Sequence, residues 1–178
     1  MLFITENKVV WRIFVLVVLI LSMLGPWFFD RIYVPAEYPC GKPTVRLYGD
    51  FCGYPMMGFL AFTYLAAGFF PMVAELIKGT YPGRAVELFA PLSAFIVILP
   101  FFSTALSIWR SNSRRFQVMN LIVWGLACVP TLLLFKAQAQ AVPFVYLLWG
   151  LCSYIALAIG VLLIESLIFR AENAKNRA

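Results

Sequence analysis

The stretch PFVYLLWGLCSYIALAIGVLLIESLIF, residues 143–169, is the longest apolar run in the chain and carries a single charged residue, Glu165. A helix that crosses the hydrocarbon core of a bilayer needs about 20 predominantly apolar residues. Because this run exceeds that length and is flanked by polar sequence, it predicts a membrane-spanning helix.

Four further apolar runs precede this one. Hydrophobic residues make up 63% of the chain and charged residues only 12%, a balance that favours lipid-facing over water-facing surfaces. We therefore expect an all-α protein, a polytopic transmembrane helical bundle of about five spans that forms a single transmembrane domain over residues 1–178. The predicted spans are 9–29, 55–77, 85–109, 116–135 and 143–169.

Short polar links join most of these runs. The link 78–84 contains Gly79, Pro82 and Gly83, which favour a tight reversal of the chain. The spans before and after it are therefore expected to be antiparallel neighbours. The chain as a whole predicts a compact up-and-down bundle whose one larger external feature is the loop 30–54.

This loop is rich in Tyr, Pro and Gly and contains Cys40 and Cys52. A disulfide between these cysteines would contribute about 3 kcal/mol in the chain-entropy model. Two interpretations of the loop stay open. It is either a docking surface for another protein or a cap over the bundle with aromatic residues at the headgroup level.

Two rules disagree on the side of the membrane where the loop lies. With five spans, nine Lys and Arg residues share the side of the loop and five lie opposite, so the positive-inside rule places the loop in the cytoplasm. A disulfide instead requires an exoplasmic location. If residues 55–77 do not cross, four spans remain and the two rules agree. We retain five spans and favour an exoplasmic loop on a multi-pass protein of the plasma (cell inner) membrane.

Ionisable residues near the predicted spans are candidates for intramembrane ion pairs or for transport. With five spans, Arg12, Glu75 and Glu87 lie toward the same side of the membrane. Glu75 lies three residues before Lys78 and Glu87 three residues after Arg84, so each glutamate has a basic partner at helical spacing.

Glu165 lies near the opposite end of the last span, where Arg110, Arg114 or Arg115 would be its partner. All three glutamates lie within about two turns of a predicted boundary, where pairing and snorkelling stabilise a charge. We therefore favour structural pairing for these glutamates and for Arg12 over a role in transport.

Small residues recur every fourth position in the last span, at Cys152, Ala156 and Gly160. Such a stripe permits the close approach of another helix, from the same chain or from a neighbouring subunit. Cys152 and Cys128 do not form the Cys-x-x-Cys pair of disulfide-exchange enzymes, so we interpret them as buried apolar side chains.

The chain contains no histidine and has a formal net charge of +6. Without histidine it lacks the usual axial ligand of haem, the commonest zinc ligand and the usual proton shuttle at neutral pH. We expect no cofactor, no metal site and no enzymatic activity. No polar segment is long enough to form a nucleic-acid-binding surface. The expected partners are the lipid bilayer and either other membrane subunits or further copies of the chain.

These features lead to two functional hypotheses. The first is a non-catalytic integral membrane protein that acts as an accessory, structural or assembly subunit of a larger membrane complex. The alternative is a small oligomeric transporter or channel that uses membrane-embedded glutamates beside helices bent by Pro71, Pro100 and Pro130.

Overall fold

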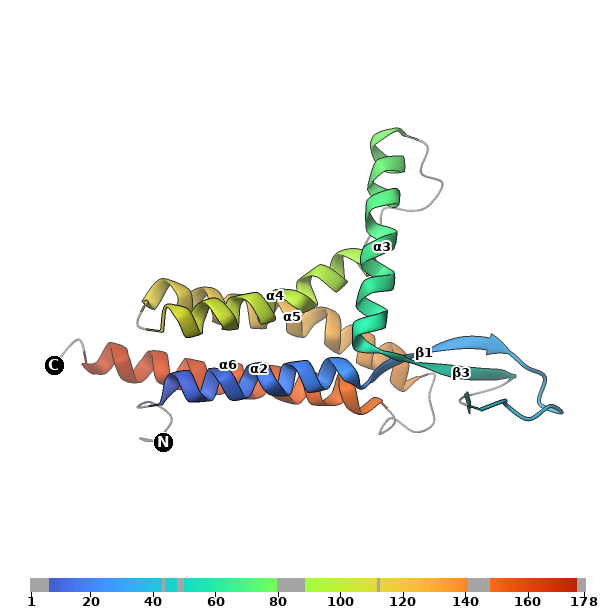
Figure 1. The fold of residues 1–178 in the computed structure, drawn as a ribbon, viewed down its shortest axis with the longest axis horizontal. Helices are drawn as coiled ribbons and strands as arrows, with labels where there is room; N and C mark the ends of the chain where they lie inside the picture. The colour runs from blue at the N-terminus through green and yellow to red at the C-terminus, as the bar shows by residue number, and fades with distance from the viewer. Residues whose placement is uncertain are drawn as a thin grey trace.

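A computed structural model describes residues 7–42, 44–47, 50–79, 89–111, 113–140 and 148–175 of the 178-residue chain. Each of the five predicted apolar segments contains a helix (Figure 1), so the all-α class is confirmed. The helices are α2 (Lys8–Leu24), α3 (Gly58–Ile77), α4 (Phe89–Trp109), α5 (Arg114–Ala139) and α6 (Trp149–Lys175).

Four of these helices form an antiparallel bundle. Helix α2 packs against α4 and α6, and α5 packs against α4 and α6, so the four helices enclose a common core. The start of α2 and the end of α6 lie at the same end of this bundle, which we call the terminal end (Figure 1). Short connections between long apolar helices favour this alternation of direction.

Helix α3 departs from the predicted compact bundle. It leaves the bundle at the end opposite the termini and runs steeply across the common direction of the other four helices (Figure 1). Its contacts within the chain are to α4, α2 and the strands at its base. The expectation that α3 and the following helix run as antiparallel neighbours along the bundle is therefore wrong. Hydropathy measures the length of an apolar run but carries no information on its direction.

A small antiparallel sheet joins α2 to α3, which the sequence analysis did not predict. Its strands are β1 (Pro26–Tyr33), β2 (Val45–Arg46) and β3 (Phe51–Met57), in the spatial order β1-β3-β2. The predicted spans 9–29 and 55–77 are thus too long, because residues 26–29 pair with residues 55–57 as strands. Pro26 and Pro55 both disfavour continued helix, and each is tolerated in a strand at its start or where its missing N–H is not needed.

Side chains anchor the sheet to the bundle. The indole N–H of Trp27 donates to the carbonyl of Ser22 at 2.9 Å, and its ring packs edge-on against Tyr154 with centroids 4.9 Å apart. The amide of Phe29 donates to the Gln138 side chain of α5. Strand β1 is therefore held to the bundle in two ways. The Trp27 side chain packs into the bundle core, and the Phe29 backbone bonds to a side chain of α5.

The first and last bundle helices approach closely beside this anchor. A Cβ atom added to Gly150 would lie 2.6 Å from the carbonyl carbon of Gly25 and 2.6 Å from the Ser22 oxygen. No side chain fits at that distance. Glycine at both positions therefore sets the separation of the α2 end from the α6 start.

Four helices within the described residues are long and apolar enough to cross a membrane. They comprise 58–77 in α3, 92–109 in α4, 114–139 in α5 and 149–172 in α6. Helix α2 is shorter, with 17 residues. Since a helix rises about 1.5 Å per residue, α2 is about 26 Å long and lies at the lower limit for a crossing. The protein is therefore a membrane protein by the length and composition of its helices.

Candidate functional site

A fully buried ion pair joins three helices near the end of the bundle that holds the termini. Arg12 of α2 donates from Nε to Glu165 Oε1 at 2.8 Å and from Nη2 to Glu165 Oε2 at 2.9 Å. Its Nη1 donates to the backbone carbonyl of Ser107 at 2.7 Å. The arginine and glutamate side chains are 0% and 1% exposed. Both carboxylate oxygens are therefore occupied by one guanidinium.

The carbonyl of Ser107 explains why an arginine is suited to this position. Ser107 lies in the last turn of α4, where carbonyl groups lack a partner within the helix. The planar guanidinium can bind a carboxylate with two donors and still reach this carbonyl with a third. A cation at a helix C-terminus is also favoured by the helix dipole. Arg12 thus supplies hydrogen-bond donors both to the Ser107 carbonyl of α4 and to the Glu165 carboxylate of α6.

A second ion pair lies near the first. Lys8 of α2 pairs with Glu172 of α6, and this pair is partly exposed. Lys8 precedes Arg12 by one turn of α2, and Glu172 follows Glu165 by two turns of α6. The two pairs therefore fix the register of α2 along α6. The sequence analysis did not identify Lys8 or Glu172 as site residues.

A chain of polar side chains continues this site between α4 and α5. Trp124 Nε1 donates to Thr104 Oγ1 at 3.0 Å, and Thr104 donates to Asn120 Oδ1 at 3.2 Å. Ser103 Oγ donates to the same Asn120 oxygen at 2.8 Å. All four side chains are buried. Hydrogen bonds between spans of this kind stabilise helix association in membranes.

Gln117 and Asn120 lie near the start of the predicted span 116–135 and were not predicted as site residues. The structure places both inside the bundle, within a helix that begins at Arg114. They lie one turn apart on α5, and Ser103, Thr104 and Ser107 lie on one side of α4. The helical spacing of these polar residues was the signal in the sequence that could have predicted a polar contact between the two helices. A search for apolar runs does not detect it, because hydroxyl side chains hardly alter hydropathy.

Of the residues predicted to form ion pairs, Arg12 and Glu165 pair with each other. Among the described residues, Glu165 makes no ion pair with the predicted partners Arg110, Arg114 or Arg115. Glu75 lies in the last turn of α3, at the far end from the bundle, and engages in an interaction of its own. Glu87 lies outside the described residues. Glu75 thus lies away from the end of the bundle that holds Arg12 (Figure 1), and their predicted placement on one side of the membrane stays a prediction.

The small-residue stripe only partly meets the bundle core. Cys152 packs against the core as a partly buried side chain. Ala156 is exposed, and a Cβ at Gly160 would meet no atom within 4 Å, so these two positions face outward from α6. Cys128 is free and partly buried, as is Cys152.

The cysteines of the loop are joined. Cys40 and Cys52 form a disulfide with Cα atoms 5.8 Å apart, which links the loop to β3. Arg46 of β2 donates to the backbone carbonyls of Val34 and Tyr38 on the facing segment. The loop 30–54 is therefore a sheet module closed by covalent and hydrogen bonds. Among its described residues, the exposed large hydrophobic side chains are Ile32, Tyr33, Tyr38, Phe51 and Tyr54.

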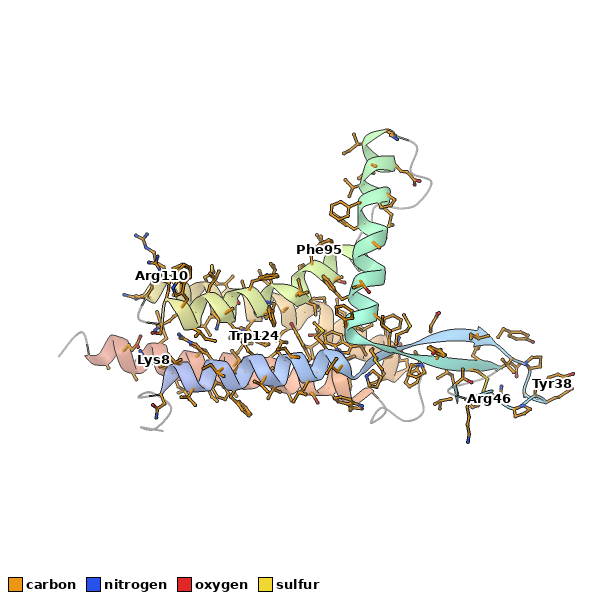
Figure 2. The ribbon with its side chains drawn as sticks, in the orientation of Figure 1. Lys8, Tyr38, Arg46, Phe95, Arg110 and Trp124 are labelled. Atoms are coloured by element: carbon orange, nitrogen blue, oxygen red, sulfur yellow. A yellow bond between two sulfur atoms is a disulfide. The ribbon has the colours of Figure 1, made fainter. Side chains whose placement is uncertain are left out.

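Helix α3 is held to α4 by aromatic contacts that reach from its second turn to its middle. The ring of Phe95 on α4 packs edge-on against Phe69 at 5.0 Å and against Phe62 at 6.2 Å, and Figure 2 shows Phe95 facing α3. Two apolar hollows of about 250 and 280 Å³ flank this contact, and Phe62 and Val97 line both. Beyond the contact, the apolar surface of α3 is open.

No group of three or more His, Cys, Asp or Glu side chains in the described part of the chain is placed to hold a metal ion. Comparison of the chain with protein-family models, with curated proteins and with solved structures found no match.

Proposed function

We propose that this protein is a non-catalytic membrane subunit that binds the helices of another membrane protein through α3. The observation that carries the proposal is the surface of α3. Only 7% of its most apolar 18-residue stretch is buried by this chain, against 39% for the corresponding stretch of α6. A helix that is apolar on all sides is normally covered on all sides.

The direction of α3 is the reason that lipid alone is a poor cover. The four bundle helices define one axis, and α3 runs steeply across it (Figure 1). If the bundle axis follows the membrane normal, α3 lies along the membrane at the sheet end, where one side would face headgroups and water. Its exposed Phe59, Phe70 and Ile77 are then stabilised by contact with another apolar protein surface.

We further propose that α2, α4, α5 and α6 cross the plasma membrane and that α3 does not. The chain termini and the α4–α5 turn then share the cytoplasmic side, and the sheet module is exoplasmic. Exposed arginines gather at the terminal end, at positions 110, 114, 115 and 170. At the sheet end the disulfide lies in an oxidising compartment. In this arrangement the positive-inside rule and the position of the disulfide indicate the same orientation of the protein in the membrane.

The transporter hypothesis has weaker support from the same geometry. An ion-carrying carboxylate needs a free oxygen and a path to water. Both oxygens of Glu165 accept hydrogen bonds from Arg12, and the pair is buried. A structural role for this pair therefore accounts for its contacts without transport.

The subunit role is tested by site-specific photo-crosslinking in intact membranes. A benzophenone amino acid is placed at Phe70 of α3, which is 68% exposed, or at the matched position Leu163 of α6, which is 62% exposed. We expect Phe70 to give a discrete adduct with one membrane protein, identified by mass spectrometry, and Leu163 to give only lipid adducts. Equal lipid labelling at both positions, together with a monomer in mild detergent, would refute the role.

A further inference from the structure

Exposed arginines cluster where α4 turns into α5. Arg110, Arg114 and Arg115 lie within a six-residue stretch and all three side chains are exposed. Figure 2 shows Arg110 pointing away from the bundle at the end that holds Lys8. We name these three residues the arginine turn.

The described acidic side chains near this end of the bundle already have basic partners. Glu165 pairs with Arg12, and Glu172 pairs with Lys8. Within the part of the chain that the structure describes, the arginine turn makes no ion pair. Arg110 lies over the ring of Trp109, and Arg114 lies over Phe169. Two of the three guanidinium groups of the turn are thus held against aromatic rings, and none of the three is neutralised by a described acidic side chain.

The local backbone adds to this excess of positive potential. Arg114 and Arg115 are the first residues of α5, and the first turn contains no acidic residue. The side chain of Ser113 makes no capping hydrogen bond. Cations at a helix N-terminus oppose the helix dipole, so this arrangement is unfavourable unless an anion lies nearby.

When α4 and α5 cross the membrane as proposed above, the turn lies at the depth of lipid phosphates. The apolar span of α4 ends at Trp109, and that of α5 begins at Arg114. Trp109 is 77% exposed, as expected for a tryptophan at a membrane interface. The arginines therefore follow the edge of the hydrocarbon core directly.

We propose that the arginine turn binds the phosphate groups of anionic phospholipids. The ligand chemistry follows from complementarity: three unneutralised guanidinium groups at headgroup depth match negatively charged lipid phosphates. This interaction is independent of the association through α3.

The experiment uses the full-length protein in vesicles that contain equal amounts of phosphatidylglycerol and phosphatidylcholine, one of which carries brominated acyl chains. Bromine quenches nearby tryptophan. The fluorescence of wild type minus that of Trp109→Phe gives the signal of Trp109. The same subtraction with Trp149→Phe gives the signal of Trp149, a half-exposed tryptophan at the sheet end. We expect brominated phosphatidylglycerol to quench Trp109 more strongly than brominated phosphatidylcholine does, with no such preference at Trp149.

Charge variants then assign the preference to the turn. Each arginine near an anionic surface contributes about fivefold to binding. We expect Arg114→Gln and Arg115→Gln each to reduce the preference several-fold, and the triple variant with Arg110→Gln to abolish it. A matched variant with Arg31→Gln, Lys42→Gln and Lys136→Gln, three exposed cations near the sheet end, should retain it.

Three results would overturn the proposal. The first is equal quenching of Trp109 by the two lipids. The second is an equal loss of preference in the matched variant, which would indicate net charge rather than a site. The third is loss of the preference on adding inorganic phosphate at constant ionic strength, which would indicate a site for free phosphate. If the triple variant does not fold, the single variants decide the outcome.

Discussion

The four-helix bundle and α3 are built from similar apolar residues but differ in where their polar groups lie. In the bundle, polar side chains face inward and bond to one another, as in Arg12 with Glu165 and in Asn120 with Ser103. In α3, the described polar side chains of Thr63 and Glu75 are exposed, and only 7% of the most apolar 18-residue stretch is buried by this chain. The bundle helices thus cover one another around buried polar groups, whereas α3 leaves most of its surface uncovered.

The largest expected effect comes from breaking the buried ion pair. Arg12→Met leaves the Glu165 carboxylate buried and unpaired, which should destabilise the protein by about 3–5 kcal/mol. The double variant Arg12→Met with Glu165→Met should recover most of this loss, because no uncompensated charge remains. Unfolding in detergent measures both. Equal instability of the single and double variants would show that the pair is needed for more than charge compensation.

Loss of the disulfide should have the next largest effect, confined to the sheet module. Cys40→Ser with Cys52→Ser releases the covalent closure of a short loop, worth about 3 kcal/mol in the chain-entropy model. Limited proteolysis should cut within residues 34–47 of the variant faster than in wild type, while the bundle helices stay protected. If the bundle is cut equally fast, the module and the bundle are not separable.

A smaller effect is expected from filling the close contact between α2 and α6. Gly150→Val forces atoms against the Gly25 backbone and should cost about 1–3 kcal/mol or more. Gly160→Val is the matched control, since no atom lies within 4 Å of the added Cβ. Thermal unfolding in detergent should separate the two variants. Similar midpoints would contradict the role of the glycine contact.

The smallest effect on folding is expected in α3. Phe70→Ser removes an exposed side chain at the edge of the Phe95 contact and should change the stability of the isolated chain by less than about 1 kcal/mol. The same change should weaken association with the partner subunit, as measured by co-purification. A fall in stability without a change in association would show that the surface of α3 packs within this chain, and it would contradict the proposed binding of a partner.

The sequence predicted the positions of the helices well because hydrophobic length is a property of a run of residues. It misplaced the ends at Pro26–Phe29 and at residues 55–57, since aromatic and apolar residues suit strands as well as helices. Strand pairing between these segments depends on contacts about 30 residues apart along the chain, which a local pattern does not contain.

The candidate site was predicted less completely than the helices. Arg12 and Glu165 were both selected as intramembrane charges, but the five-span topology placed them toward opposite sides of the membrane. The structure pairs them although they lie 153 positions apart. Asn120, Ser103 and Thr104 were not recognised because their effect depends on the face of each helix that meets the other. The direction of α3 was likewise invisible, since an apolar run has the same composition whether or not it crosses the membrane.

The edge of the sheet has a consequence for the behaviour of many copies of this protein at one membrane. The amides of Phe29 and Arg31 in β1 donate to the side chains of Gln138 and Asp30. A sheet edge whose donors are already engaged is a poor template for an incoming strand. Neighbouring molecules are thereby hindered from joining their sheets into a continuous ribbon, even when they are crowded.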